Sequence, residues 1–185
     1  MNDQVVEVVR HEDLASSDIE GLRGLFDSEY FVDFGRWDPE QPYGYAPHDV
    51  HVIARANRRI VGHVGWARRE IAVGSRLVAV AGVGGVLATE AERGSGLGKL
   101  LMTCAAQTMR EWHDDVDFGY LGCREEVVPF YVSCGWTQIS ATETFADRDG
   151  APVTELPGPP ILILPIRETA SAWPHGDIDL RGRAW

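Results

Sequence analysis

The chain has 185 residues, of which 44% are hydrophobic and 24% are charged. Acidic residues (28) outnumber Lys and Arg (17), which gives a formal net charge of −11. This length suits one compact domain, residues 1–185, with a sizeable core. The acidic excess argues against nucleic acid as a partner, because such a surface repels phosphates and attracts cations. We therefore expect a small cationic molecule as the ligand.

The sequence also argues against a membrane partner and an oxidising compartment. No stretch approaches the roughly 20 apolar residues of a membrane-spanning helix. The first residues, MNDQVVEVVR, lack the basic and apolar segments of a secretory signal. Cys104, Cys123 and Cys134 are odd in number and contain no Cys-x-x-Cys pair, so neither a disulfide framework nor a zinc ribbon is indicated. We expect a cytoplasmic protein.

The N-terminal part of the chain is predicted to form a strand, a helix and a long loop. The strand covers residues 5–10, VVEVVR. The helix covers residues 17–30, with one apolar face and either Ser17 or Asp18 as its N-cap. Residues 31–49 are rich in proline, glycine, aromatic and acidic residues. Connections of this length usually bind something, so we expect this loop to contact a substrate.

The rest of the chain alternates between predicted strands and helices. Three β-rich segments are joined by short turns, which indicates an antiparallel meander, at residues 50–56, 58–73 and 75–88. Apolar residues then recur at helical spacing from Leu97 to Trp112. A strand at 117–123, a short helix ending at Gly135 and a buried strand at 161–166 complete the pattern. The sum is a mixed α/β (α+β) domain with a mostly antiparallel sheet flanked by helices.

Residues 92–101, ERGSGLGKLL, have the composition of a phosphate-binding turn. They are not a P-loop, because Leu100 stands where a P-loop needs a Ser or Thr for magnesium. They are not a dinucleotide fingerprint, because Lys99 occupies the place of its third glycine. The remaining pattern is Arg-x-x-Gly-x-Gly between a strand and a helix, where main-chain N–H groups suit a diphosphate. It is formed by Arg93, Gly96 and Gly98.

This pattern resembles the coenzyme A signature of the GNAT superfamily of N-acetyltransferases. The match spans VLATEAERGSGLGKLL, with Glu90 where that superfamily often has proline, and PFYVSCGW resembles its later Phe-Tyr-x-x-x-Gly-Trp segment. The resemblance implies the GNAT fold and acetyl-CoA as the cofactor. It also implies cofactor contacts from the preceding strand and the loop, at Val86, Leu87, Ala88, Arg93, Gly94, Ser95, Gly96, Leu97, Gly98 and Lys99.

The same resemblance implies the chemistry. An amine attacks the acetyl carbonyl, negative charge grows on the carbonyl oxygen, and a thiolate departs. A β-bulge in the strand from Gly85 to Ala88 would free a main-chain N–H of residues 86–88 to stabilise that oxygen. Tyr131, in PFYVSCGW, would donate a proton to the thiolate. The alternatives are a core aromatic at this position and a thiolate that leaves unaided.

Nearly the whole chain resembles two acyltransferase families that act on 2-amino sugars. The aminoglycoside 2'-N-acetyltransferases share GGVLA, FYVSCGW, LPI and the terminal Trp185. The tail ILILPIRETASAWPHGDIDLRG resembles the nodulation N-acyltransferases, which acylate chitin oligosaccharides. Acetylation of an aminoglycoside, an antibiotic-resistance activity, is our first expectation, because a cationic antibiotic suits the net charge of −11.

Two positions depart from the aminoglycoside family. Gly84 stands where that family has an acid that acts as base through water, and Arg183 stands where it has another acid near the end. An atypical aminoglycoside such as kasugamycin would suit these departures. They leave the base open among Asp33, Asp38, Glu40, His63 and the α-carboxylate of Trp185. The expected substrate-binding residues are Asp33, Trp37, Asp38, Glu40, Gly84 and Trp185, of which Asp38 and Trp185 join Tyr131 as candidate catalytic residues.

Three further expectations concern metals, other functions and assembly. His48 and His51 lie at a strand entry with no third ligand nearby in sequence, so no metal site is expected. An N-acyltransferase for another amine, such as a polyamine or a peptide, would keep the same cofactor loop. A non-catalytic acyl-CoA-binding module would bind the cofactor and release no thiol. The resemblance leaves a homodimer open.

Overall fold

Strands of one mixed sheet form the frame of the computed structural model, which describes residues 4–185. Antiparallel pairs dominate, and the parallel pairs within this part of the chain are β4–β5 and β7–β10. The predicted mixed, mostly antiparallel sheet is therefore confirmed. The strands are β1 (Gln4–Arg10), β2 (Val50–Ala56), β3 (Arg59–Val73), β4 (Arg76–Ala88), β5 (Phe118–Gly122), β6 (Thr137–Ile139), β7 (Glu143–Ala146), β8 (Pro152–Thr154), β9 (Ile161–Pro165) and β10 (Ile178–Asp179).

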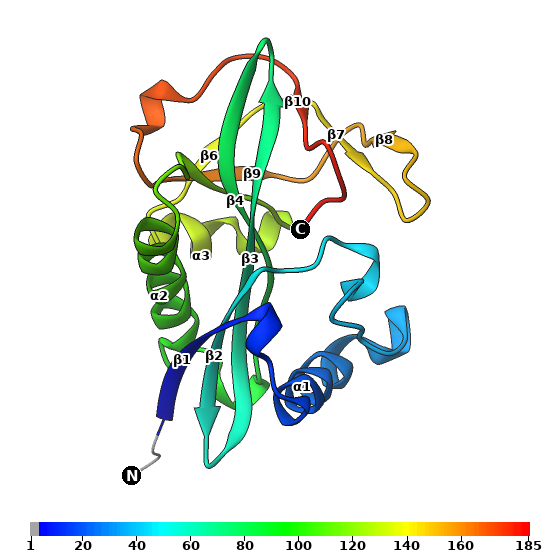
Figure 1. The fold of residues 1–185 in the computed structure, drawn as a ribbon, viewed down its shortest axis with the longest axis vertical. Coiled ribbons are helices and arrows are strands. Elements are labelled where there is room, and N and C mark those ends of the chain that lie inside the picture. Colours follow the sequence, from blue (N-terminus) through cyan, green and yellow to red (C-terminus); the bar gives the residue numbers. More distant parts are fainter. Residues whose placement is uncertain (1–3) are drawn as a thin grey trace.

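The long hairpin of β3 and β4 joins two parts of the sheet (Figure 1). The β2 strand pairs with the first half of β3, and β1 pairs with β2. At the other end, β10 pairs with the last residues of β3, and β5 pairs with β4 on its opposite edge. The predicted meander over β2, β3 and β4 is confirmed. Asn57 and Arg58, both with positive φ, form the turn between β2 and β3.

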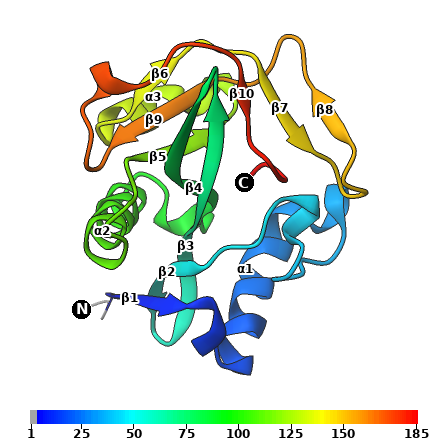
Figure 2. The ribbon, with the colours of Figure 1, turned by 45° about the horizontal axis from the view of Figure 1, so that its top comes forward.

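The helices α1 (Ser16–Phe34) and α2 (Leu97–Trp112) lie on opposite sides of this sheet, and α3 (Val128–Ser133) follows β5 (Figures 1 and 2). The first helix is longer than predicted. The expectation that Ser17 or Asp18 is its N-cap is wrong, because the helix begins earlier and its N-cap is Ala15. Asp18 accepts a hydrogen bond from the Ala15 N–H (3.0 Å) from within the first turn. It continues to Phe34, because the chain first turns away at Gly35, which has φ 77°.

Alternation along β2 and β3 sends successive side chains to the two sides of the sheet. Val52 and Val64 pack with α2 in one hydrophobic cluster, whereas Ile53 packs with α1 in another. The same alternation turns His51 and His63 toward the α1 side. The alternation of buried apolar residues therefore brings two histidines from adjacent strands to the same side of the sheet.

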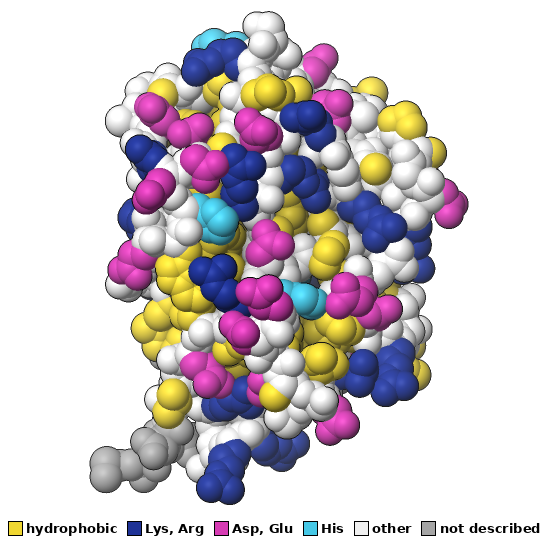
Figure 3. All heavy atoms as spheres, in the orientation of Figure 1, with side chains coloured by type: hydrophobic (Ala, Val, Ile, Leu, Met, Phe, Trp, Pro, Cys, Tyr) yellow, Lys and Arg dark blue, Asp and Glu magenta, His cyan; other side chains and the backbone are white. Residues whose placement is uncertain are grey.

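The surface of the described residues carries mixed charges. Acidic and basic side chains are interspersed over the face drawn in Figure 3. Within residues 4–185, no helix is long and apolar enough to cross a membrane.

Candidate functional site

The β4 and β5 strands separate beyond their short parallel contact. They pair at Val80–Gly82 with Phe118–Tyr120 and then diverge. In the same stretch, the register between β3 and β4 shifts, because Gly84 pairs with Gly65 but Leu87 pairs with His63. Residues 85 and 86 therefore form a β-bulge that pairs with neither neighbouring strand. Gly85 has φ 58°, a left-handed conformation that favours glycine.

The glycine-rich loop reaches α2 with its main chain exposed. Gly94 (φ 79°) and Gly96 (φ 92°) adopt left-handed conformations, and an added Cβ at either would meet no atom within 4 Å. Among residues 4–185, no main-chain acceptor bonds the N–H groups of four positions: Gly94, Gly96, Gly98 and Lys99. An open turn with free N–H groups at the start of a 16-residue helix fits a diphosphate.

Other predicted residues of this loop hold it in shape. The Arg93 guanidinium pairs with Glu29 (Nη2–Oε1 2.6 Å) and donates from Nε to the Ala88 carbonyl (3.3 Å). The Ser95 hydroxyl donates to the Glu92 carbonyl (2.7 Å), and the Leu97 N–H donates to Ser95 Oγ (3.3 Å). These contacts anchor the loop to β4 and α1, so the arginine side chain is engaged within the protein.

A cavity of about 790 Å³ opens where β4 and β5 separate. It is lined by β4 at Val83–Val86, by aromatic side chains of α1 and the following loop, by Tyr131 of α3, and by the segment ending at Trp185. In Figures 1 and 2 the end of the chain lies between the β3–β4 ribbon and the loop after α1. This volume is typical of a small-molecule site.

Tyr131 lies in the wall of this cavity with 8% of its surface exposed. Burial raises the pKa of its hydroxyl, and the nearby Cys123 and Cys134 thiols act in the same direction. The hydroxyl is therefore protonated at neutral pH and is able to donate a proton. This is the protonation state that the expected role as general acid requires.

Trp37, Gly84 and Trp185 line the cavity among the predicted substrate-binding residues. The predicted acids Asp33, Asp38 and Glu40 are exposed and are not part of the lining. Asp33 lies in the last turn of α1 and not in the loop where the sequence suggested it. Asp38 Oδ1 accepts the Glu40 N–H (3.0 Å), and Glu40 Oε1 contacts His11 Nε2 (2.9 Å).

The acidic residues that do line the cavity come from segments after β5 and were not predicted from the sequence. They are Glu125, Glu143 and Glu155. Glu143, on β7, is 9% exposed and accepts a hydrogen bond from the Tyr120 hydroxyl. Desolvation raises the pKa of this carboxyl group. A buried carboxylate in a cavity is a strong partner for a cation, because removal from water strengthens the attraction.

The glycines of β4 make room for the end of the chain. A Cβ at Gly82 would lie 2.0 Å from Trp185 Cδ2. A Cβ at Gly84 would lie 2.8 Å from the Trp185 main-chain carbon and 2.9 Å from His48 Nε2. The space that an acid at position 84 would occupy is therefore filled. Arg183 contributes its carbonyl, which accepts from Arg69 Nη1 (2.7 Å) beneath the Trp185 ring.

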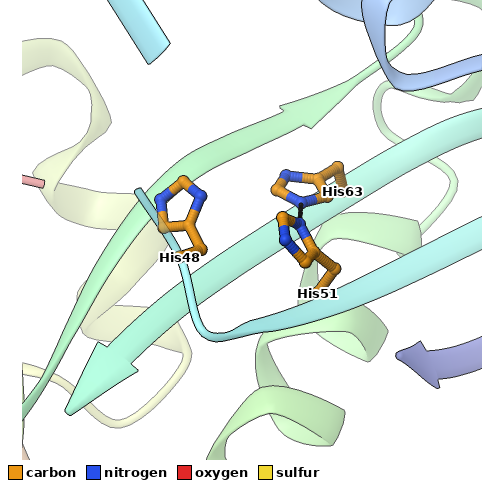
Figure 4. Close-up of side chains that lie close together, drawn as sticks. All are labelled: His48, His51 and His63. Atoms are coloured by element: carbon orange, nitrogen blue, oxygen red, sulfur yellow. Dashed lines mark hydrogen bonds between the residues drawn. The ribbon is translucent and has the colours of Figure 1, made fainter. Parts of the chain in front are cut away.

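Three buried histidines meet beside the bulge (Figure 4). The expectation that His48 and His51 lack a third companion is wrong, because β3 supplies His63, and one ring nitrogen of each lies within 4.8 Å of the others. Burial lowers the pKa of His48 to about 3, that of His51 to about 2 and that of His63 to about 4. All three are therefore neutral at neutral pH. His63 itself is fully buried, so it does not contact the cavity directly.

Comparison with known proteins identifies the family. The chain matches the model of the family described as Nodulation protein A (NodA) over residues 3–183. None of the curated proteins is a significant match to this sequence.

Solved structures share the fold at low sequence identity. ElaA of Escherichia coli is 21% identical, over 86% of this chain and 97% of that one, with a TM-score of 0.60. An acyl-CoA N-acyltransferase of Pseudomonas aeruginosa is 17% identical, over 88% and 99%, with a TM-score of 0.62. A GNAT family N-acetyltransferase (YhbS) of Escherichia coli, in complex with CoA, is 12% identical, over 97% and 91%, with a TM-score of 0.64.

These likenesses confirm the expected GNAT fold. The family match covers almost the whole chain, and the glycine loop follows the strand whose bulge lines the cavity. The chain belongs to the nodulation protein A (NodA) family, has the GNAT fold, and is classed with the acyl-CoA-dependent N-acyltransferases.

Proposed function

We propose that the protein transfers an acetyl group from acetyl-CoA to the amine of a 2-amino sugar, with a cationic aminoglycoside as the first choice of acceptor. The observation that carries this proposal is the position of Glu143. Its buried carboxyl group lines the same cavity as the β4 bulge and Tyr131. A protonated amino sugar that binds this carboxylate would lie in the cavity that also holds the groups for acyl transfer.

The residues of this chain fit the cofactor. The free N–H groups of Gly94, Gly96, Gly98 and Lys99 would bind its diphosphate. Bound acetyl-CoA would supply a thioester carbonyl for attack and a thiolate as leaving group. The bulge of β4 lines the cavity at the place where β4 and β5 separate.

Three groups of the protein would act on the reacting atoms. The Val86 N–H belongs to no strand pair and would stabilise negative charge on the carbonyl oxygen. Tyr131, kept protonated by burial, would donate its proton to the departing sulfur. Glu143 would bind an ammonium group of the acceptor and orient the sugar for attack.

A second acceptor class is favoured by the family match. The sequence resembles the nodulation N-acyltransferases, and that family covers residues 3–183 of this chain. The free amine of a chitin oligosaccharide is therefore the alternative acceptor. Kasugamycin remains a candidate within the aminoglycoside class, since the acid of the family pattern is replaced by Gly84 and the space beside it is filled.

Parallel incubations test the proposal. The protein and acetyl-CoA are mixed with kasugamycin, a standard aminoglycoside, a partly deacetylated chitin oligomer, a polyamine or a peptide, and both thiol release and product mass are recorded. We expect the mass of an acetylated amino sugar among the products. Acetylation of the polyamine or the peptide alone would assign another N-acyltransferase. Binding of acetyl-CoA with no thiol released for any amine would indicate a non-catalytic module.

A further inference from the structure

A chain of hydrogen-bonding groups runs from the surface to the β4 bulge. His11, in the 3-10 turn His11–Asp13, contacts Glu40 through Nε2 (2.9 Å) and His51 through Nδ1 (3.1 Å to Nε2). His51 Nδ1 lies 2.9 Å from His63 Nε2, and His63 Nδ1 lies 2.7 Å from the Gly85 carbonyl oxygen. Exposure falls along this chain, from 74% for the Glu40 side chain to 0% for His63.

The four contacts of this hydrogen-bond chain need one more proton than three neutral imidazoles carry. The four contacts each need one proton. The Gly85 carbonyl and an ionised Glu40 only accept, and three neutral imidazoles carry one N–H each. Four filled contacts therefore require a fourth proton, shared between His11 and Glu40 at one end or placed on a buried imidazole.

Burial places the fourth proton at the surface end. The lowered pKa values of His51 and His63 keep both rings neutral. The ionisable groups that face His11 are Glu40 in the loop after α1, His51 on β2 and His48 just before β2. Since Glu40 is the acid among them, the fourth proton belongs to the contact between His11 Nε2 and Glu40 Oε1. The proton on the Nδ1 atom of His11, of His51 and of His63 then lies on the side of the next group toward Gly85.

The same chain fixes the direction of the peptide at the bulge. The Gly85 carbonyl accepts from His63, so it points away from the cavity into the protein. This peptide is trans, which directs the N–H of Val86 to the opposite side. Neither β3 nor β5 pairs with residue 86, and Val86 lines the cavity. A proton donated to a carbonyl also polarises the N–H of the same peptide.

We propose that His63, supported by His51, His11 and Glu40, is a positioning residue that turns and polarises the Gly85–Val86 peptide, so that the Val86 N–H serves as the oxyanion donor. This inference rests on the proposed acyl transfer. A metal ion is the less favourable occupant, because two zinc ligands at 2.0–2.1 Å in tetrahedral geometry lie about 3.3 Å apart. The 2.9 Å between His51 and His63 is the length of a hydrogen bond.

Glu40 is the exposed end of the hydrogen-bond chain, so it can be substituted without disturbing the core. In Glu40→Gln the amide N–H donates to His11 Nε2, so three neutral imidazoles complete the chain without a titratable proton. In Glu40→Leu the contact is lost. We expect Glu40→Gln to keep a kcat close to that of the wild type, because the contact with His11 is retained.

The other variants separate positioning from a general effect on structure. Glu40→Leu should lower kcat several-fold with the KM for acetyl-CoA unchanged. Glu12→Gln, an exposed acid beside His11, is the control and should follow the wild type. His63→Gln should lower kcat by roughly 10²-fold, the cost of losing one oxyanion donor. Equal kcat values for the wild type and Glu40→Leu would overturn the proposal, as would an equal loss of kcat in Glu40→Gln and Glu40→Leu, or an effect of Glu40→Leu on KM alone.

NMR spectroscopy tests the hydrogen-bond chain without any enzyme activity, so its result holds even if the proposed function is wrong. Two-bond nitrogen–proton NMR spectra report which ring nitrogen carries the proton, and we expect Nδ1–H for both His51 and His63. An Nε2–H form at either residue would overturn the chain. Tight binding of added Zn²⁺ that shifts the signals of His48, His51 and His63 together would assign a metal site instead. If no amine is acetylated but both rings carry Nδ1–H, the acyl-transfer function fails and the hydrogen-bond chain stands.

Discussion

Replacement of Glu143 by Gln should weaken acceptor binding and leave cofactor binding intact. Glu143 is 9% exposed and lines the cavity, and Gln keeps an oxygen that accepts from the Tyr120 hydroxyl. The substitution therefore removes the charge and keeps the packing. A hydrogen bond between charged groups contributes about 1.5–3 kcal/mol. Its loss should raise the KM of a cationic acceptor by roughly 10- to 150-fold.

The same substitution should stabilise the protein at neutral pH. Burial raises the pKa of Glu143, so the folded state holds its proton more tightly than the unfolded state does. Ionisation of this group therefore costs stability, and that cost appears as pH rises from the unfolded pKa through the folded pKa. Gln has no such cost. Glu143→Gln should have a higher Tm than the wild type at pH 7, and the difference should shrink in acid.

The assay measures thiol release at varied acceptor concentration with acetyl-CoA saturating, alongside thermal melts at two pH values. Glu155→Gln is the matched control, because Glu155 lines the same cavity but is exposed, and exposed ion pairs contribute little. An unchanged acceptor KM in Glu143→Gln, with a normal melt, would refute the assignment of Glu143 to the acceptor. An equal rise in KM for both variants would mean that the general charge of the cavity, and not this buried carboxylate, attracts the substrate.

Three further substitutions test other parts of the site. Tyr131→Phe should lower kcat by roughly 10²-fold or more with little change in acetyl-CoA affinity, and unchanged turnover would remove this hydroxyl from the chemistry. Gly96→Leu should abolish acetyl-CoA binding in calorimetry, whereas Gly150→Leu, with a similar positive φ and open space, should pay a similar backbone cost of about 1–2 kcal/mol and still bind. Gly82→Ala places a methyl group against the Trp185 ring, so the tryptophan fluorescence should change and the acceptor KM should rise, with cofactor affinity kept.

Features that depend on local pattern were predictable from the sequence. The β2–β3–β4 meander and α2 follow from alternation and helical spacing over long segments. The conformation of the glycine loop is also local, since Gly94 and Gly96 adopt left-handed conformations that favour glycine. Short strands are different. The four residues of β7 or the two of β10 show no periodicity, and they become strands because neighbours pair with them.

Features that depend on which segments meet were not predictable. Glu143 becomes buried because β7 lies beside β10 and its carboxyl group meets Tyr120 of β5, and nothing near residue 143 indicates this. Asp33, Asp38 and Glu40 form the more conspicuous acidic group in the sequence, yet all three face solvent. The companion of His51 was within reach of sequence reasoning, because the predicted hairpin already sets β3 beside β2, and the shared phase of alternation would have found His63.

We propose that free main-chain N–H groups of the glycine loop hold the diphosphate of an acyl-CoA. Amide NMR spectra recorded with coenzyme A and, separately, with pantetheine, which lacks the diphosphate, test this binding mode. We expect large amide shifts with coenzyme A, and none with pantetheine, at Gly94, Gly96, Gly98 and Lys99. Binding of coenzyme A that leaves these four amides unshifted would contradict it.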